Sequence, residues 1–397
     1  MSQTHPQIVA QTVVLVAGGT GGHMFPALAV ASELSARGLN PVFLTDKRGL
    51  QYLPDESAMP RHVLSAADPR GGVARALLHM PQAISQANKA LKHIAPKAVI
   101  GFGGYATLAV MIAARLRGIA TCLHEQNAVL GRVNRFMARF VGAIALTYQE
   151  TTLVPPAASP RARVTGNPVR PSFIEKSALE YTPHEYGREF RLFVIGGSQG
   201  AAILSVVVPA ALRLLPISLR ETISLTQQCR PETLDDVARQ CEEAGIKADL
   251  ATFFHDIDER LSNAHLVIGR SGASTISEAE ICARPAILVP LPTAMDDHQT
   301  ANAKPLDDDG SAWLMPQPDF TAEALSALLQ QLIENPDQLE NASSALRRRA
   351  RPDAATRVAD LVEGLASGAT QETGAAKDGG PRGPHHIHSS WAIRGMQ

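Results

Sequence analysis

Residues 13–23 read VVLVAGGTGGH, and this stretch sets the organisation of the whole chain. Its apolar, mostly β-branched start is typical of a buried strand. The two glycine pairs that follow let the backbone turn sharply and approach a ligand closely. Apolar residues at helical spacing after Pro26 then predict a helix that ends near Gly38. A strand, a glycine turn and a helix start together direct free backbone N–H groups at an anion.

The pattern occurs a second time near the middle of the chain, where residues 191–200 read RLFVIGGSQG. Each glycine turn is suited to open its own α/β domain, so we predict two similar halves with parallel sheets facing each other across a cleft. The alternative is a pair of tight turns without a ligand, but two glycine pairs exceed what a turn requires.

The composition of the chain excludes several classes of protein. With 397 residues, 45% hydrophobic residues and a net charge of −1, it predicts a soluble protein of two or three domains without a global attraction for nucleic acid. The four cysteines are scattered without metal-ligand spacing, which indicates a reducing compartment. We find neither a signal peptide pattern nor an apolar stretch of the roughly 18 residues that a span requires, so a membrane role is expected to be peripheral.

Three loops of unusual composition follow successive predicted strands of the first half. They are 18–23, 101–105 (GFGGY) and 124–127 (HEQN). Loops after parallel strands lie at one edge of an open sheet, where ligands bind. The other elements expected here are strands at 40–45, 61–64, 97–100 and 121–123, a helix over 106–116, and a helix or helix pair over 73–94 broken near Pro81.

The second half is expected to begin after a proline-rich passage at 154–171. It should contain strands at 266–269 and 286–289, a polar loop over 292–302, and helices over 274–283, 321–335, 336–350 and 353–365. Beyond residue 368 the composition is typical of a disordered tail. Its His385, His386 and His388 are of a type that binds metal, but we favour an incidental or tag-like role.

The acidic residues allow several interpretations. A dinucleotide oxidoreductase should show GxGxxG, which GGTGGH does not fit, and Asp46 alone is weak evidence for a ribose-binding acid. Glu278, early in a helix, is suited to accept hydrogen bonds from ribose hydroxyls, although an ordinary first-turn acid explains it equally well. The run Asp296-Asp297-His298-Gln299 suggests either a divalent cation or contacts with sugar hydroxyls, and we favour the sugar.

His23 is the first candidate for a general base. It follows the glycines of the first turn, and the ordinary histidine pKa of about 6.5 suits proton transfer near neutral pH. His124 and Glu125, at a neighbouring strand end, form the competing acid–base pair. A purely structural histidine is the alternative for His23.

Several motifs together resemble one family. They are GGTGGHMFPALAVA (18–31), GFGGY (101–105), HEQN (124–127), TGNPVRP (165–171), GGSQGA (196–201), RSGASTISE (270–278) and DDHQTANA (296–303). In this order, over about residues 12–365, they resemble the MurG family of UDP-N-acetylglucosamine:N-acetylmuramyl-(pentapeptide)-pyrophosphoryl-undecaprenol N-acetylglucosaminyltransferases.

The resemblance implies a GT-B fold, in which two Rossmann-like domains face each other and the last helix crosses back to the first. We therefore expect an N-terminal domain over 1–170, a C-terminal domain over 171–352, a crossing helix over 353–366 and a disordered tail over 367–397. It also implies inversion at the anomeric carbon with no cofactor and no required metal.

The resemblance assigns residues to roles by motif. His23 or Glu125 would be the base. Phe254 departs from the smaller aliphatic residue common at its position, but its contact with uracil is expected through the backbone. Acceptor binding would involve Gly103, Gly104, Tyr105, His124 and Asn127. Donor binding would involve Thr20, Gly21, Gly22, Asn127, Arg170, Ser198, Phe254, Ala273, Ser274, Thr275, Ile276, Ser277, Glu278 and Gln299.

The implied reaction transfers GlcNAc from UDP-GlcNAc to the C4 hydroxyl of the muramic acid of lipid I (undecaprenyl-pyrophosphoryl-MurNAc-pentapeptide), giving lipid II and UDP. It belongs to peptidoglycan synthesis, and thus to cell shape and division, at the cytoplasmic face of the inner membrane. The rival classes are a sugar-nucleotide sensor without turnover and a GT-B epimerase acting on UDP-GlcNAc. Retention of His23, GFGGY and HEQN argues against a sensor.

A lipid acceptor requires the N-terminal domain to touch the bilayer. The helical stretch with Val73, Leu77, Leu78, Met80 and Ile84 is unusually apolar, and Arg70 and Arg75 lie beside it in the sequence. We expect an apolar patch with basic flanks there. The alternative is that these side chains pack into the core.

Overall fold

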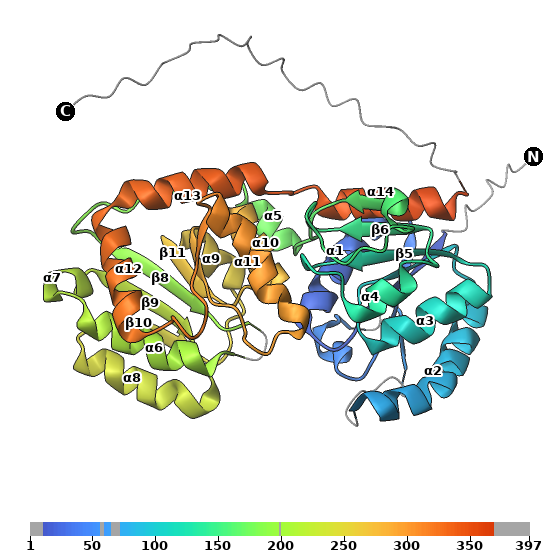
Figure 1. Cartoon of the computed structure of the whole chain (residues 1–397), viewed down its shortest axis with the longest axis horizontal. Coiled ribbons are helices and arrows are strands. Elements are labelled where there is room, and N and C mark those ends of the chain that lie inside the picture. The colour runs from blue at the N-terminus through green and yellow to red at the C-terminus, as the bar shows by residue number, and fades with distance from the viewer. Residues whose placement is uncertain (1–10, 56–58, 65–71, 198–199, 369–397) are drawn as a thin grey trace, which may run out of the picture.

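The computed structural model describes residues 11–55, 59–64, 72–197 and 200–368, with the backbone alone over 72–77. These residues form two parallel sheets, each covered by helices, and Figure 1 shows the two halves side by side. No helix among them combines the length and apolarity needed to cross a bilayer.

The N-terminal half is built on a seven-stranded sheet of order β3-β2-β1-β4-β5-β6-β7. Its central strand is fully buried from Val13 to Val16, as the apolar run predicts. The strands are β1 (Thr12–Val16), β2 (Asn40–Thr45), β3 (Arg61–Val63), β4 (Ala98–Gly101), β5 (Ala120–Glu125), β6 (Ala143–Leu146) and β7 (Ala162–Val164). The α-helices are α1 (Gly21–Ala36), α2 (Gly72–Ile94), α3 (Tyr105–Leu116) and α4 (Arg132–Met137), with a short 3₁₀ helix, η1 (Gly49–Tyr52).

The C-terminal half repeats the arrangement with a six-stranded sheet of order β10-β9-β8-β11-β12-β13. Its strands are β8 (Phe190–Ile195), β9 (Ile223–Gln228), β10 (Lys247–Ala251), β11 (Leu266–Gly269), β12 (Ala286–Leu288) and β13 (Ala312–Leu314). Its helices are α5 (Pro171–Lys176), α6 (Ala202–Leu214), α7 (Ile217–Arg220), α8 (Leu234–Glu243), α9 (Ile257–Asn263), α10 (Ala273–Cys282), α11 (His298–Asp308), α12 (Ala322–Glu334) and α13 (Pro336–Arg349).

The two sheets share one topology, which confirms the prediction of two similar halves. β1 lies between β2 and β4, and β8 lies between β9 and β11. The strand order therefore reverses beside each strand that leads into a glycine turn, and such a switch point is where open α/β sheets bind ligands.

The last helix, α14 (Ala354–Ala366), returns to the N-terminal half, as the resemblance implies (Figure 1). Val358 and Val362 are fully buried in the same apolar cluster as Val13. On the surface of α1, Arg37 pairs with Asp360 at 2.7 Å and with Glu363 at 2.5 Å. The residue numbers of the domain boundaries, 170 and 352, stay predictions.

Three element boundaries in the N-terminal half differ from those expected. Helix α1 begins at Gly21 and contains Pro26, since glycine adopts helical as readily as turn dihedral angles and so does not mark where the turn ends. Helix α2 continues through Pro81, because its buried face, which includes Ala87 and Leu91, packs against the sheet and offsets the lost hydrogen bond. Strand β5 extends to Glu125.

Two predicted loops contain regular structure. The 154–171 passage includes η3 (Ser159–Arg161) and β7, which pairs with β6, so the connection between the halves is shorter than predicted. The 292–302 loop contains η5 (Met295–Asp297) and the start of α11. Polar residues on an exposed helix resemble loop composition, which explains the error. The predicted disordered tail beyond Gly368 lies outside the described residues, and Ser367 and Gly368 form a turn.

Candidate active site

The first glycine turn holds His23 at the carboxyl edge of the N-terminal sheet. Its Nδ1 lies 3.2 Å from the carbonyl oxygen of Gly18. A carbonyl oxygen only accepts, so Nδ1 carries the proton and Nε2 is free to accept one. Burial lowers the pKa of His23 below its ordinary value, opposed by the Gly18 hydrogen bond and the charge of Glu125, so the ring is neutral near pH 7.

The GFGGY loop lies against the His23 ring. A Cβ at Gly103 would lie 3.0 Å from Nε2 of His23, and the φ of Gly103 is +102°. Only glycine combines this close approach with that backbone conformation at low cost. Gly104 and the half-buried Tyr105 follow at the start of α3, so the predicted acceptor loop is next to the predicted base.

Asp46 supports the glycine turn and is not free for a ribose. Its carboxylate is 4% exposed and accepts hydrogen bonds from the backbone nitrogens of Gly19 (3.2 Å) and Gly49 (2.9 Å). Arg48 pairs with the other oxygen at 2.9 Å.

Glu125 is a buried carboxylate whose two oxygens are both occupied. Oε1 accepts from the backbone nitrogen and the Nδ2 of Asn127, at 3.1 and 3.2 Å. Oε2 accepts from the nitrogen of Gly131 and from Nδ2 of Asn134, both at 2.8 Å. This carboxylate shapes the 126–134 loop, and taking up a proton would break those bonds.

His124 is likewise part of the scaffold. Its side chain is fully buried, its Nε2 donates to the carbonyl oxygen of Gly166 (3.2 Å), and its Nδ1 accepts from Nε2 of Gln126 (3.1 Å). Burial lowers its pKa to about 4. Both ring nitrogens of His124 thus have partners within the chain, and its contact with an acceptor stays a prediction.

The second glycine turn leads into the C-terminal half. A Cβ at Gly196 would collide with the backbone nitrogen of Ala201, so the tight turn requires glycine there. Ser198, predicted to contact the donor, lies outside the described residues.

The start of α10 is surrounded by buried polar atoms without partners. Among the described residues these include the hydroxyls of Ser271 and Ser274, Oδ1 of Asn167 and Nε of Arg170. Unpartnered buried polar atoms are costly, so a polar ligand at this position would satisfy them. Ala273 to Ser277 form the first turn and a half of the helix. The backbone nitrogen of the buried Ile276 already donates to the carbonyl oxygen of Gly272 at 3.1 Å, so the N–H groups that favour an anion are those of the residues before it.

Glu278 and Arg170, predicted to bind the ribose and the diphosphate, contact each other. Nη2 of Arg170 lies 2.9 Å from Oε1 of Glu278, which is 6% exposed. Burial raises the pKa of Glu278, and the Arg170 guanidinium opposes that rise. The guanidinium also lies over the rings of Phe25 (4.6 Å) and Phe173 (4.7 Å), so Arg170 connects α1, α5 and α10.

The remaining predicted donor residues lie on several elements. Thr20 precedes α1, with Gly21 and Gly22 in its first turn. Phe254 is buried against Phe193, with the Arg260 guanidinium 4.1 Å from its ring centroid. Oε1 of Gln299, on α11, accepts from the nitrogen of Leu291 at 2.9 Å.

Asp296, considered above as a metal ligand, forms ion pairs with Arg132 (3.1 Å) and Arg135 (3.0 Å) of the N-terminal half. In the described part of the chain, no three His, Cys, Asp or Glu side chains gather as a metal site.

Asn302 was not among the predicted site residues. It is fully buried on α11 and hydrogen-bonds to the Asn127-Ala128 loop of the other half. A signal was available, because Asn302 lies three residues after Gln299, on the same side of a helix.

Comparison with known proteins agrees with this arrangement. Residues 13–146 match the glycosyltransferase family 28 N-terminal domain, and residues 191–358 match the glycosyltransferase family 28 C-terminal domain. A protein of Paramagnetospirillum magneticum named UDP-N-acetylglucosamine--N-acetylmuramyl-(pentapeptide) pyrophosphoryl-undecaprenol N-acetylglucosamine transferase is 48% identical over 361 residues, 89% of this chain and 96% of that protein. A Zymomonas mobilis protein of the same name is 43% identical, covering 92% and 95%.

Solved structures give the same result. The Acinetobacter baumannii MurG crystal structure matches with a TM-score of 0.73 and 31% identity, covering 89% of this chain and 99% of that one. The Neisseria meningitidis UDP-GlcNAc 2-epimerase matches with a TM-score of 0.65 but 14% identity, which shows the fold alone. Fold and site together define a glycosyltransferase of the GT-B class. Within that class, the chain belongs to the MurG family.

Proposed function

We propose that this protein transfers GlcNAc from UDP-GlcNAc to the muramic acid of lipid I, giving lipid II and UDP in peptidoglycan synthesis. The observation that carries the proposal is the 48% identity, over 96% of its length, to a relative named for this reaction. The residues gathered where the two halves meet have the chemistry that such a transfer needs.

The donor is assigned to the C-terminal half. The diphosphate would lie at the start of α10, where the Ser274 hydroxyl has no hydrogen-bond partner and the first backbone N–H groups of the helix are free to donate. Glu278 would accept from the ribose hydroxyls, with the uracil near the backbone of Phe254. GlcNAc would then extend toward Asn127 and Gln299, and toward the glycine turn that begins at Gly18.

The reaction we propose is a direct displacement with inversion. The C4 hydroxyl of muramic acid attacks C1 of GlcNAc while the bond from C1 to the diphosphate oxygen breaks. Nε2 of His23 accepts the hydroxyl proton, since its other nitrogen is fixed on Gly18. Arg170 and the start of α10 stabilise the charge that develops on the departing UDP. The occupied oxygens of Glu125 favour His23 as the base.

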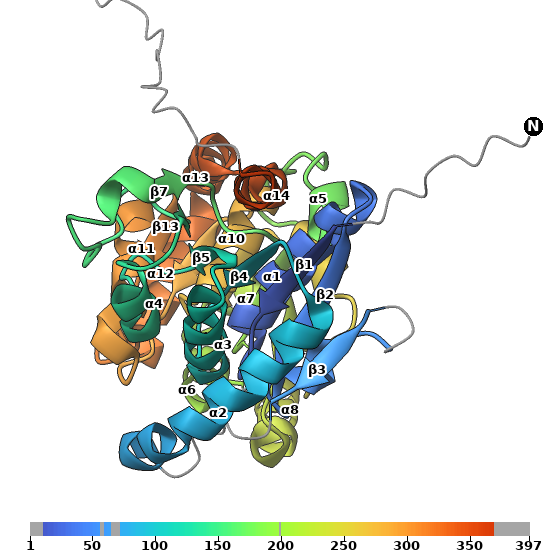
Figure 2. The same ribbon diagram turned by 90° about the vertical axis from the view of Figure 1, so that its right-hand side faces the viewer.

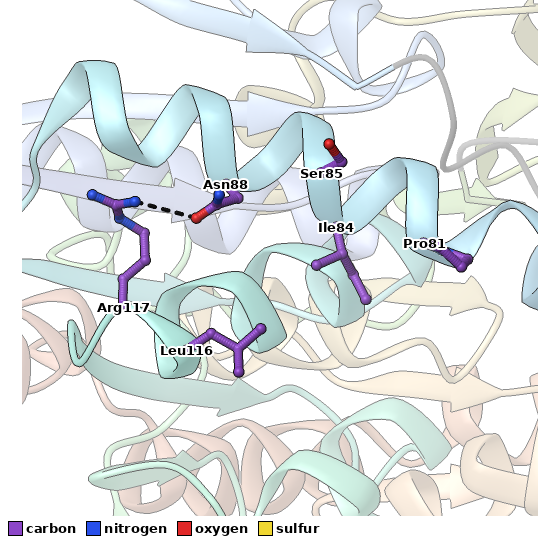
Figure 3. Close-up of a pocket in the computed structure, with 6 residues that line it drawn as sticks. All are labelled: Pro81, Ile84, Ser85, Asn88, Leu116 and Arg117. Atoms are coloured by element: carbon purple, nitrogen blue, oxygen red, sulfur yellow. Dashed lines mark hydrogen bonds between the residues drawn. The ribbon is translucent and has the colours of Figure 1, made fainter.

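We further propose that the N-terminal half contacts the cytoplasmic face of the inner membrane as a peripheral protein. Helices α2 and α3 lie side by side, as Figure 2 shows. Leu78 and Leu116 are each 77% exposed there. A pocket of about 620 Å³ between the helices is lined by Pro81, Ile84, Ser85, Asn88, Leu116 and Arg117 (Figure 3).

The predicted apolar patch divides between surface and core. Leu78 is exposed, Met80 is half-buried and Ile84 packs against the buried cluster of the N-terminal sheet. Arg70 and the side chains of Val73, Leu77 and Arg75 lie outside the described residues. The exposed Leu116 and the adjacent Arg117 combine an apolar and a basic side chain, which suits the boundary of an anionic bilayer.

Incubation with radiolabelled UDP-GlcNAc, with and without lipid I, tests the proposed reaction. If the protein catalyses the transfer, label appears in a lipid product, and it does so only when lipid I is present. An epimerase would convert the UDP-sugar without an acceptor, and a sensor would bind it unchanged.

A further inference from the structure

The Asn302 side chain bridges the two halves and uses both the oxygen and the nitrogen of its carboxamide. Its Oδ1 accepts from the backbone nitrogen of Ala128 at 2.8 Å. Its Nδ2 donates to Oδ1 of Asn127 at 3.1 Å and to the carbonyl oxygen of Ser271 at 3.2 Å. The residue is fully buried, so water does not replace these bonds.

The partners of Asn302 lead to both substrate sites. Asn127 also donates to Glu125, so its side chain is fixed between the end of β5 and α11. Ser271 directly precedes Gly272, the residue that caps α10. One carboxamide therefore sets the distance between the loop of the acceptor half and the helix start of the donor half.

We propose that Asn302 is a positioning residue for the transfer, an inference that rests on the proposed function. It holds the Asn127 side chain and the start of α10 in the register that a direct displacement needs. Misplacement of a reacting group by 1 Å costs about 100-fold in rate, so losing this bridge should lower kcat even where the donor still binds.

A second contact across the same interface provides a control for simple cohesion. Asp296 pairs with Arg132 and Arg135, whose side chains are 66% and 36% exposed. These exposed pairs do not involve Asn127 or Ser271. Arg132→Gln removes the more exposed of these pairs at a residue outside the predicted sites.

The test is Asn302→Asp, which changes shape very little. The new carboxylate still accepts from Ala128 but faces the oxygens of Asn127 and Ser271. Asn127 cannot turn its amide round, because its Nδ2 is held by Glu125. We expect kcat with lipid I to fall about 100-fold. The Kd for UDP should stay within about threefold, because Asn302 hydrogen-bonds to Asn127, Ala128 and Ser271 and to none of the α10 residues predicted to bind UDP.

If the Asn302→Asp variant does not fold, Asn302→Ser tests the same bridge without adding a charge. In that variant kcat should fall about tenfold or more. The proposal is overturned by wild-type kcat in the folded variant, by parallel losses of kcat and UDP affinity, or by an equal loss of kcat in Arg132→Gln. Wild-type enzyme that transfers no GlcNAc to lipid I contradicts the proposed function itself, and this inference with it.

Discussion

The two glycine turns lead into sites of different character. On the N-terminal side, the charged groups beside the turn are already engaged, with Asp46 and Glu125 each holding backbone nitrogens. On the C-terminal side, the hydroxyls of Ser271 and Ser274 and the Nε of Arg170 are buried without partners. We infer that the groups around His23 are already held in place by hydrogen bonds within the N-terminal half. The buried polar groups of the C-terminal half would obtain their partners from the ligand.

His23→Ala should have the largest effect, because it removes the imidazole that we propose as the general base. We expect kcat to fall by on the order of 100-fold or more, with UDP affinity nearly unchanged. Since burial lowers the pKa of His23, the neutral base persists to lower pH than usual. The acid limb of the kcat/KM profile, which reports the free enzyme, should therefore lie below the ordinary histidine pKa of about 6.5.

The measurements are kcat and the pH profile of kcat/KM for lipid I, alongside calorimetry of UDP binding. Wild-type kcat in the alanine variant would assign the proton to another group.

Glu278→Ala should weaken UDP binding by the C-terminal half. Charge-assisted hydrogen bonds contribute about 1.5–3 kcal/mol each, so UDP affinity should fall about 10- to 100-fold by calorimetry. Glu280 is the matched control, because this half-buried acid of the same helix pairs with Arg349 at 3.2 Å. Glu280→Ala should lower the Tm but leave UDP affinity intact. Equal loss of UDP affinity in both variants would mean that the helix, not the ribose contact, was damaged.

Glu125→Gln tests whether the first site is a scaffold. One oxygen becomes an amide that faces N–H donors, which should cost about 1–3 kcal/mol of stability and lower the Tm. Activity should follow the folded fraction. A variant with wild-type Tm but no turnover would make Glu125 the base and reverse our assignment.

Local elements were predictable from the sequence, and contacts between the halves were not. The apolar runs before Gly18 and Gly196 indicated buried strands, and Ser271-Gly272 indicated the start of α10. Each of these depends on neighbouring residues. Arg170 and Glu278 are 108 positions apart, and Ala128 and Asn302 are 174 apart, so their pairing depends on how two finished halves meet. The continuation of α2 through Pro81 likewise depends on packing against another element.

Leu78→Glu should have the smallest effect, and it extends the comparison of the halves to their surfaces. If the N-terminal half alone touches the bilayer, losing one exposed leucine should forfeit about 1.4 kcal/mol, a tenfold loss in binding to anionic vesicles. The KM for lipid I should rise by a similar factor while UDP affinity stays unchanged. Ile217→Glu is the matched control, since Ile217 is 63% exposed on the C-terminal half. The Ile217→Glu variant should cosediment with vesicles as the wild-type protein does. Equal losses of vesicle binding in both variants would show that the added charge, and not the lost leucine contact, governs binding. Wild-type vesicle binding by both variants would place the membrane contact elsewhere on the N-terminal half.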